Sequence, residues 1–192
     1  MNVLELVKKN RSYRGYDESV RLTKEQLREL VELARFSASS VNLQPLKFLV
    51  LSDEAEVKRL QPLTGWARAL PERHLPDEGH RPTSFIVICH DTAIAENVQR
   101  FWKDVGIVAQ SMLLGAVEKG FGGCMIGNFS PEKVAKEFSL SENLVPVLIV
   151  ALGKPQETIV LEDYKGGSIN YYRDDQDVHY VPKRTLEELI IK

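Results

Sequence analysis

Residues 144–153 read LVPVLIVALG, and this stretch decides the fold. Nearly every side chain in it is apolar, yet the run is far shorter than the roughly 20 residues that a membrane-spanning helix needs. Valine and isoleucine favour strands, and a strand that is apolar at every position has both faces covered. We therefore predict that this segment is the central strand of a sheet and that Gly153 and Pro155 end it.

Segments on either side of this strand predict the rest of the sheet. LKFLVLS, residues 46–52, and SFIVICHD, residues 84–91, are short, apolar and rich in β-branched or aromatic side chains, as buried strands are. GFGGCMIGNF, residues 120–129, places glycines around a short β-prone stretch. Because glycine lets another group approach the backbone closely, we expect something to pack tightly against this segment.

Segments between the predicted strands show helical periodicity and are predicted to be helices. Residues 23–36 begin with the capping-box pair Thr23 and Gln26, followed by apolar residues spaced three and four apart. These apolar positions are Leu27, Leu30, Val31 and Ala34.

A second, longer helix is predicted over residues 93–119. Its broad apolar stripe, which includes Trp102, would face either a core or a partner subunit. Ser130 and Pro131 have the residue types of a helix start, and residues 185–188 repeat the capping-box pattern before a short C-terminal helix.

Two regions give no clear pattern. Prolines interrupt residues 53–82, which we interpret as a flap or a surface excursion, and residues 156–182 predict an extended, irregular tail. The prolines of the first region are Pro62, Pro71, Pro76 and Pro82.

The composition is typical of one globular domain covering residues 1–192. Hydrophobic residues make up 43% of the chain, and a net charge of -2 argues against binding driven by nucleic-acid phosphates. The N-terminus lacks a signal-peptide pattern and no uninterrupted apolar run reaches about eighteen residues, so we expect a cytoplasmic protein that does not enter a membrane. Cys89 and Cys124 lie far apart in apolar segments, which predicts two buried thiols and no metal site.

The segment SASSVNLQPLKF, residues 37–48, carries more polar side chains than a turn needs. One or two hydrogen-bonding side chains suffice to close a turn. The excess favours either a long capped loop or a surface that binds a small polar ligand. The polar side chains are Ser39, Ser40, Asn42 and Gln44, and Pro45 follows them.

The segment NRSYRGYD, residues 10–17, concentrates positive charge around a hydroxyl group. Two guanidinium groups beside a hydroxyl can hold a phosphate through charge-assisted hydrogen bonds. Surface ion pairs with the acidic residues that follow are the alternative. The same two interpretations apply to Lys183 and Arg184 near the C-terminus. The donors of the first segment are Arg11, Ser12 and Arg14.

Common nucleotide-binding and hydrolase motifs do not fit this chain. The glycines at 120–127 lack the helix and the later acidic residue of a dinucleotide fingerprint, and no Walker loop occurs. No nucleophile elbow is present either, which disfavours hydrolase chemistry.

The order of the segments resembles the nitroreductase family of flavoproteins. NRSYRGYD after a first helix, SASSVNLQPLKF after a second, DVGIVAQSMLLGAVEKGFGGCMIGNF, LVPVLIVALGKP and a basic residue before a last helix follow one another as in that family. The resemblance spans nearly the whole chain, except residues 53–82. It implies an α+β fold, with a central, mostly antiparallel sheet flanked by helices, and a homodimer that binds FMN at sites shared between the subunits.

The resemblance also implies roles for particular residues. The serine-rich loop would reach the FMN held mainly by the other subunit, the basic residues would receive its phosphate, and the segment around Met125 would lie along its ring. Arg14 is the candidate cation near the pyrimidine edge of the ring. The implied cofactor-binding residues are Arg11, Ser12, Arg14, Ser39, Ser40, Asn42, Gln44, Met125, Ile126, Gly127, Lys183 and Arg184.

The implied activity is that of an enzyme in which FMN carries the chemistry and no catalytic side chain is needed. NADH or NADPH would donate electrons, and a nitroaromatic, quinone or similar small-molecule acceptor would take them in a ping-pong order. A flavin-binding carrier or sensor without efficient turnover is the alternative. If residues 53–82 fold over the flavin, Trp66 and Arg68 would set substrate preference, although Trp66 is also compatible with a core position.

The chain departs from the family pattern at three positions. Asn10 stands where many members have a first arginine, Ala38 replaces a proline, and Leu46 replaces a common aromatic residue. The first change removes a cation from the expected phosphate site, and the other two alter the stiffness and packing of the loop.

Overall fold

The computed structural model describes residues 1–70 and 72–191. The predicted central strand is confirmed, since β5 pairs with β3 along one edge and with β4 along the other, and the short β1 pairs with its last two residues. β2 extends the sheet beyond β3, and every pairing is antiparallel. Gly153 does not end the strand, because it pairs with Gly122 inside the ladder. The strands of this sheet are β1 (Tyr16–Asp17), β2 (Leu46–Leu51), β3 (Ser84–Asp91), β4 (Gly122–Ile126) and β5 (Leu144–Pro155).

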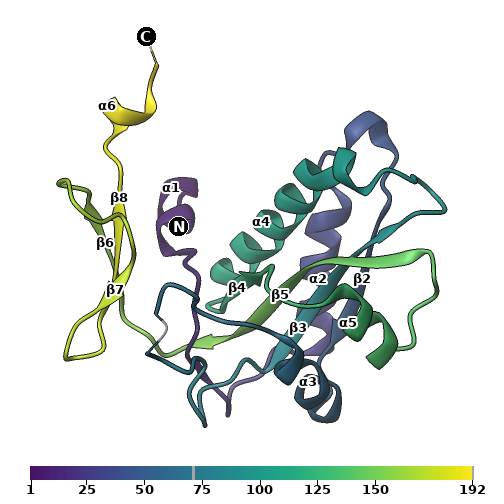
Figure 1. Cartoon of the computed structure of the whole chain (residues 1–192), viewed down its shortest axis with the longest axis horizontal. Helices are drawn as coiled ribbons and strands as arrows, with labels where there is room; N and C mark the ends of the chain where they lie inside the picture. Colours follow the sequence, from purple (N-terminus) through teal and green to yellow (C-terminus); the bar gives the residue numbers. More distant parts are fainter. Residues whose placement is uncertain (71, 192) are drawn as a thin grey trace.

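Helices cover both faces of the central sheet. Successive side chains of a strand point to opposite faces, so Ile86 and Ile88 of β3 enter a core with α2 and α4, whereas Phe85 and Val87 enter a second core with α3 and α5. Figure 1 shows the sheet between these two pairs of helices. The helices are α1 (Val3–Lys9), α2 (Lys24–Arg35), η1 (Ser40–Asn42), α3 (Glu54–Leu60), η2 (Gln61–Leu63), η3 (Val98–Phe101), α4 (Trp102–Glu118), α5 (Pro131–Glu137) and α6 (Leu186–Leu189).

The predicted helix starts are confirmed at three places and wrong at one. Thr23 Oγ1 accepts a hydrogen bond from Gln26 N at 3.1 Å, and Gln26 Oε1 accepts one from Thr23 N at 2.9 Å. Ser130 caps α5, and the second capping box precedes α6. The long helix begins at Trp102 and not at residue 93, because η3 precedes it. Trp102 is 50% exposed, so it does not belong to the buried stripe.

The C-terminal segment is more regular than the sequence predicts. It forms a second sheet in which β8 (His179–Lys183) pairs with β6 (Ile159–Asp163) in parallel and with β7 (Tyr172–Arg173) antiparallel. Figure 1 shows this second sheet beside α1, at one end of the molecule. The prediction of an irregular tail at 156–182 is therefore wrong. Parallel pairing joins strands that are distant in sequence, so no hairpin pattern reveals it.

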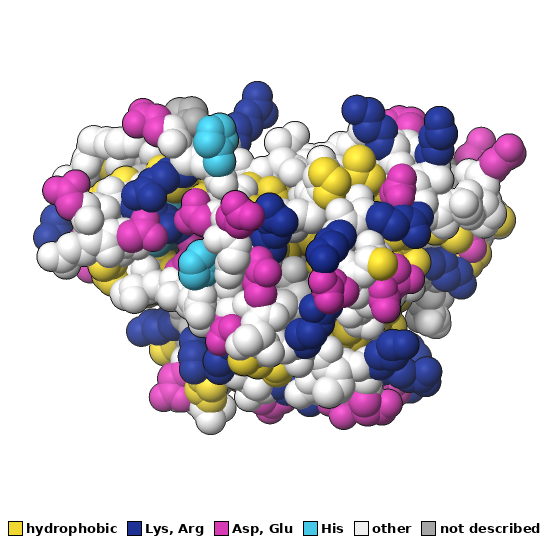
Figure 2. Space-filling model, turned by 90° about the horizontal axis from the view of Figure 1, so that it is seen from below, with side chains coloured by type: hydrophobic (Ala, Val, Ile, Leu, Met, Phe, Trp, Pro, Cys, Tyr) yellow, Lys and Arg dark blue, Asp and Glu magenta, His cyan; other side chains and the backbone are white. Residues whose placement is uncertain are grey.

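The described residues contain no helix that is long and apolar enough to cross a membrane, and no cluster of side chains suited to hold a metal ion. The predicted buried thiols are confirmed, and burial raises the pKa of Cys89 to about 12. Figure 2 shows the molecule from below, where Lys and Arg side chains are interspersed with Asp and Glu. No large patch of a single charge covers that face.

Candidate functional site

The basic segment after α1 lies along β4. Ser12 pairs with Gly123 as a parallel bridge, and Tyr13 N donates a hydrogen bond to Gly123 O at 3.1 Å. A Cβ atom at Gly122 would lie 2.6 Å from the ring of Tyr13, and one at Gly123 would overlap the carbonyl oxygen of Ala151. The N-terminal segment therefore packs tightly against Gly122, whereas β5 and α4 pack tightly against Gly123.

The end of β4 is more open than its beginning. Met125 is 37% exposed, and Ile126 beside it is 3% exposed and belongs to the core. A Cβ atom at Gly127 would meet no other group within 4 Å. Open backbone therefore follows the tightly packed start of β4, and a planar ligand could approach it closely.

Arg11 is a half-buried cation without a carboxylate partner among the described residues. Its Nη2 donates to Val7 O at 2.9 Å, and its Nε is buried with no hydrogen-bond partner. Burial lowers the pKa of the guanidinium from its ordinary value. The ion pairs of the described residues do not join Arg11 or Arg14 to Asp17 or Glu18, so the surface-pair alternative is wrong here. A buried donor without a partner is unusual and fits an anionic ligand.

Arg14 is covered by the second sheet. Its guanidinium lies 4.7 Å from the ring centre of Tyr171, and its Nη1 donates to Ser12 O at 3.2 Å. Its backbone N donates to Glu157 Oε2 at 2.6 Å. Only 9% of Arg14 is exposed, so the C-terminal segment determines how much of this cation a ligand can reach.

A buried ion pair next to Arg14 helps to hold the second sheet against the basic segment. Glu157 pairs with Arg173, and their side chains are 6% and 4% exposed. His179 lies nearby, and burial together with Arg14 and Arg173 lowers the pKa of His179 to about 4. Sequence reasoning missed these residues, and no local pattern marks them, because the partners are far apart in a segment without periodicity.

The serine-rich loop is held by Asp104 of α4. Ser39 Oγ donates to Asp104 Oδ2 at 2.7 Å, and Ser40 donates to Asp104 Oδ1 from its hydroxyl at 2.8 Å and to Oδ2 from its backbone N at 2.9 Å. Burial opposes ionisation of Asp104, but these hydrogen bonds lower its pKa below the ordinary value. The two hydroxyls therefore serve to fix the loop. Asp104 was missed, although a carboxylate within the apolar stripe of the predicted helix was a usable signal.

The rest of this loop adopts an uncommon backbone conformation. Val41, Asn42 and Gln44 have φ angles of 48°, 57° and 51°, in the left-handed region that residues with a Cβ rarely occupy. Gln44 Nε2 donates to Asn42 Oδ1 at 3.0 Å, and Gln44 N donates to Ser39 Oγ at 3.0 Å. Contacts with Asp104 and within the loop stabilise this conformation, which leaves Asn42 and Gln44 exposed.

The predicted site residues lie in separate parts of one chain. In the basic segment, Asn10 Nδ2 donates to Gln110 Oε1 of α4 at 3.2 Å. In the serine-rich loop, Ser37 Oγ lies 2.9 Å from Ser111 Oγ, which is on a different side of α4 from Gln110. Figure 1 shows the loop with η1 beyond one end of α4 and α1 near the other. The basic segment and the serine-rich loop therefore do not meet within a single chain.

Lys183 and Arg184 lie at the end of β8 in the second sheet. The guanidinium of Arg184 is 5.3 Å from the ring centre of Tyr164 and 3.5 Å from Glu188 Oε1. Among the described residues, no hydrogen bond or ion pair joins either cation to Arg11 or Ser12. Arg14 contacts Tyr171 and Glu157 of the C-terminal segment, whereas Lys183 and Arg184 make no such contact with the basic segment in the described residues.

The fold and this geometry define an α+β protein whose central antiparallel sheet carries a basic segment and a glycine-containing strand along one edge. The chain belongs to the nitroreductase family, because the model of that family matches residues 7–154. The predicted family, fold class and oxidoreductase class are confirmed. The match ends just before the second sheet begins.

Individual relatives agree with this assignment. The chain is 27% identical over 182 residues to "Putative NAD(P)H nitroreductase YdgI" of Bacillus subtilis (strain 168), covering 79% of this chain and 87% of the relative. It is 25% identical over 174 residues to FMN reductase (NADPH) of the same organism, covering 80% of this chain and 66% of that protein.

Solved structures share the fold. A nitroreductase family protein from Clostridium difficile 630 has a TM-score of 0.66 and 26% sequence identity, covering 82% of this chain and 86% of the other. A protein from Exiguobacterium sibiricum 255-15, solved in complex with FMN, has a TM-score of 0.67 and 23% identity, covering 82% of this chain and 90% of the other.

Proposed function

We propose that this chain is an FMN-dependent oxidoreductase that takes electrons from NADH or NADPH and passes them to a nitroaromatic, quinone or similar small acceptor in a ping-pong order. Family membership supports the redox class, and the names of two relatives support the donor and the cofactor. The observation that carries the proposal is Arg11, a half-buried guanidinium with an unpartnered Nε on the segment paired with β4.

Bound FMN supplies the electron-transfer chemistry, and the side chains bind and orient it. Arg11 and Ser12 provide donors for its phosphate, and a dianion needs several donors in one place. The open backbone at Gly127 and the exposed side chain of Met125 leave room for a planar ring beside β4. Arg14 supplies positive charge near the ring, and Lys183 or Arg184 adds a smaller contribution to the phosphate.

We further propose a homodimer with two shared sites. The basic segment and the serine-rich loop lie apart in one chain, so a complete site needs the loop of a second copy, with Ser39, Ser40, Asn42 and Gln44. Exposed apolar side chains on α1 and α4, directly after α2 and on the serine-rich loop support an interface there, since large exposed apolar groups in clusters mark contact surfaces. These side chains are Val3, Leu4, Phe36, Val41, Trp102 and Ile107.

The first experiment is a visible absorption spectrum of the purified protein after addition of FMN and desalting, followed by NADH or NADPH without oxygen. A retained yellow chromophore that bleaches supports the proposal. Retained flavin that neither nicotinamide reduces indicates a carrier or sensor instead. A colourless protein contradicts both functions.

Arg11→Ala tests the phosphate assignment. Loss of a charge-assisted hydrogen bond costs about 1.5 to 3 kcal/mol, so FMN affinity should fall by about tenfold or more in a fluorescence titration. Arg28→Ala, which removes an exposed cation from α2, is the matched control and should leave the affinity unchanged. Equal FMN affinity in the two variants would show that Arg11 does not bind the phosphate.

A further inference from the structure

A cavity of about 680 Å³ lies between α3, the segment after β1 and the loop that leads into β3. Arg11, Met125 and Gly127 do not line it, so it is distinct from the proposed flavin site. Buried Val57 and Leu75 contribute apolar surface, and charged side chains stand at its exposed edge. A concave site with an apolar lining and a few polar groups is typical of small-molecule binding.

The indole of Trp66 forms a wall with a fixed orientation. Trp66 Nε1 donates to Thr64 Oγ1 at 2.8 Å, and Thr64 Oγ1 donates to Gln61 O at 2.6 Å. The ring also packs against the core between α3, α5 and the sheet. A planar, rigid apolar surface inside a cavity suits an aromatic ligand, which can stack against it.

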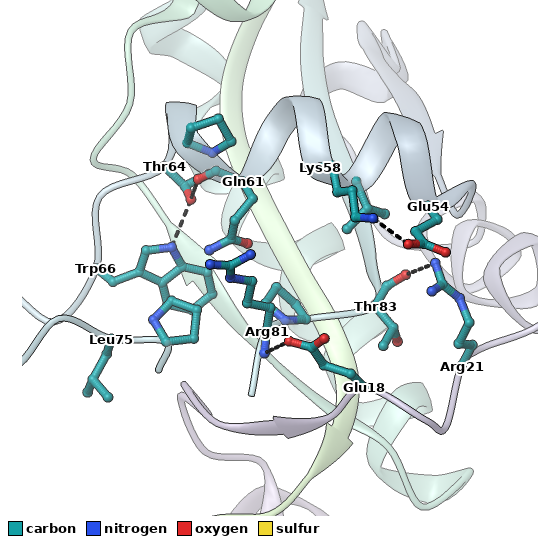
Figure 3. A pocket seen from close by; sticks show the side chains of 14 residues that line it. Glu18, Arg21, Glu54, Lys58, Gln61, Thr64, Trp66, Leu75, Arg81 and Thr83 are labelled. Atoms are coloured by element: carbon teal, nitrogen blue, oxygen red, sulfur yellow. Dashed lines mark hydrogen bonds and ion pairs between the residues drawn. The ribbon is translucent and has the colours of Figure 1, made fainter. Parts of the chain in front are cut away.

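Two polar groups of the cavity have no partner among the described residues. The guanidinium of Arg81 forms no hydrogen bond or ion pair, since only its backbone N bonds Glu18 Oε1, at 2.7 Å. Gln61 Oε1 is buried without a donor. Figure 3 shows the side chains of Gln61, Trp66 and Arg81 gathered on one side of the cavity.

The other cations of the cavity are already occupied. Lys58 forms an ion pair with Glu54 at 2.5 Å. Arg21 Nη2 donates to Ser52 O at 3.2 Å and to Thr83 O at 3.3 Å. Among the described residues that line the cavity, Arg81 is therefore the cation whose guanidinium has neither a hydrogen-bond nor an ion-pair partner, and Gln61 Oε1 is the unpaired buried acceptor beside the aromatic wall.

We propose that this cavity binds a small aromatic acid that carries a hydrogen-bond donor on its ring. Its carboxylate pairs with Arg81, its ring lies against Trp66, and its hydroxyl or amino group donates to Gln61 Oε1. The acidic side chains of Glu18 and Glu54 disfavour a multiply charged phosphate in the same place.

The test must separate the cavity from the proposed flavin site, because the two are close. Gly65 N donates to Asn128 O at 2.7 Å, directly after Gly127. A ligand that stacks on bound flavin perturbs the visible flavin spectrum, whereas a ligand in the cavity reaches Trp66 without touching the flavin ring. Calorimetry should therefore be combined with the visible spectrum.

The experiment is a calorimetric titration of the FMN-loaded protein with 4-hydroxybenzoate and, separately, with benzoate. We expect saturable binding without a change of the flavin spectrum. Arg81→Gln should weaken binding of both acids about tenfold, because a charge-assisted hydrogen bond is lost. Gln61→Leu should weaken binding of 4-hydroxybenzoate and spare benzoate, which has no ring donor.

Arg28→Gln is the matched control, because Arg28 is an exposed cation of α2 that does not line the cavity. It should bind both acids like the unchanged protein, and thermal unfolding should confirm that all variants fold. Absence of saturable binding, or equal binding by Arg81→Gln and Arg28→Gln, would overturn the proposal. If the protein does not retain FMN, the same titration without flavin still tests the cavity.

Discussion

The central sheet and the second sheet are stabilised by different interactions. The first lies between two apolar clusters, and β3 is buried along its whole length. In the described part of the second region, residues 156–191, no apolar residue is buried, and the buried groups are His179 and the side chains of Glu157 and Arg173. This region is attached through Glu157, Arg173 and the stacking of Arg14 on Tyr171. A sheet without an apolar core of its own thus depends on a few polar contacts.

The largest expected effect comes from the apolar core. Ile149 of β5 is fully buried between α3, α5 and the sheet. Ile149→Ala should lower the free energy of unfolding by about 3 kcal/mol, because it removes apolar contacts and leaves a cavity. Denaturant unfolding measures this loss, and Val160→Ala on the partly exposed β6 should cost far less. Similar losses in the two variants would remove the contrast between the sheets.

Glu157→Gln should loosen the second sheet alone. Removing one charge of a buried pair leaves Arg173, among the described residues, with only Asp177 as an ionic partner, at a local cost of about 2 to 3 kcal/mol. Amide hydrogen exchange should therefore accelerate in β6 and β8 and stay unchanged in β5. Glu187→Gln, an exposed carboxylate on α6, is the control. Unchanged exchange in β8 would show that the ion pair does not hold this region.

Acid should affect the second sheet before the first. The pKa of His179 is lowered from 6.5 to about 4 in the folded chain, mainly by burial, while Arg14 and Arg173 also oppose its charge and Asp177 favours it. The unfolded chain binds a proton at higher pH, so this stabilisation is complete above about pH 6.5 and is lost as the pH falls to about 4, by at most about 3 kcal/mol.

The NMR signals of Tyr171 should report this acid transition, because its ring packs in a tilted orientation against His179, with 5.2 Å between the ring centres. His179→Gln should abolish the pH dependence in this window, and His74→Gln, on the surface, should keep it. A transition that persists in His179→Gln would assign the effect to other groups.

The smallest expected effect concerns the cations of the second sheet. Arg184 is exposed and already lies near Glu188, so Arg184→Ala should weaken FMN binding by less than about threefold. Lys183→Ala should behave similarly, and Arg11→Ala, measured in the same titration, is the reference for a large effect. A tenfold loss in Arg184→Ala would show that the second sheet supplies a main phosphate contact.

Much of the central sheet follows from the sequence because apolar burial leaves a periodic signal. The apolar runs of β5 and β3 and the capping box of α2 are visible in order along the chain. The second sheet was missed because its parallel pairing and its anchoring ion pair join residues that no local pattern connects.

The candidate site divides in the same way. The sequence by itself determined the residue types, the family and the positions of the basic segment and the serine-rich loop. Only the tertiary structure decided that Asp104 takes up the hydroxyls of Ser39 and Ser40, and that Glu157 and Tyr171 cover Arg14. The physical reason is that hydrogen bonds and ion pairs depend on distances between groups far apart in sequence, whereas burial of a strand or helix depends on neighbouring residues.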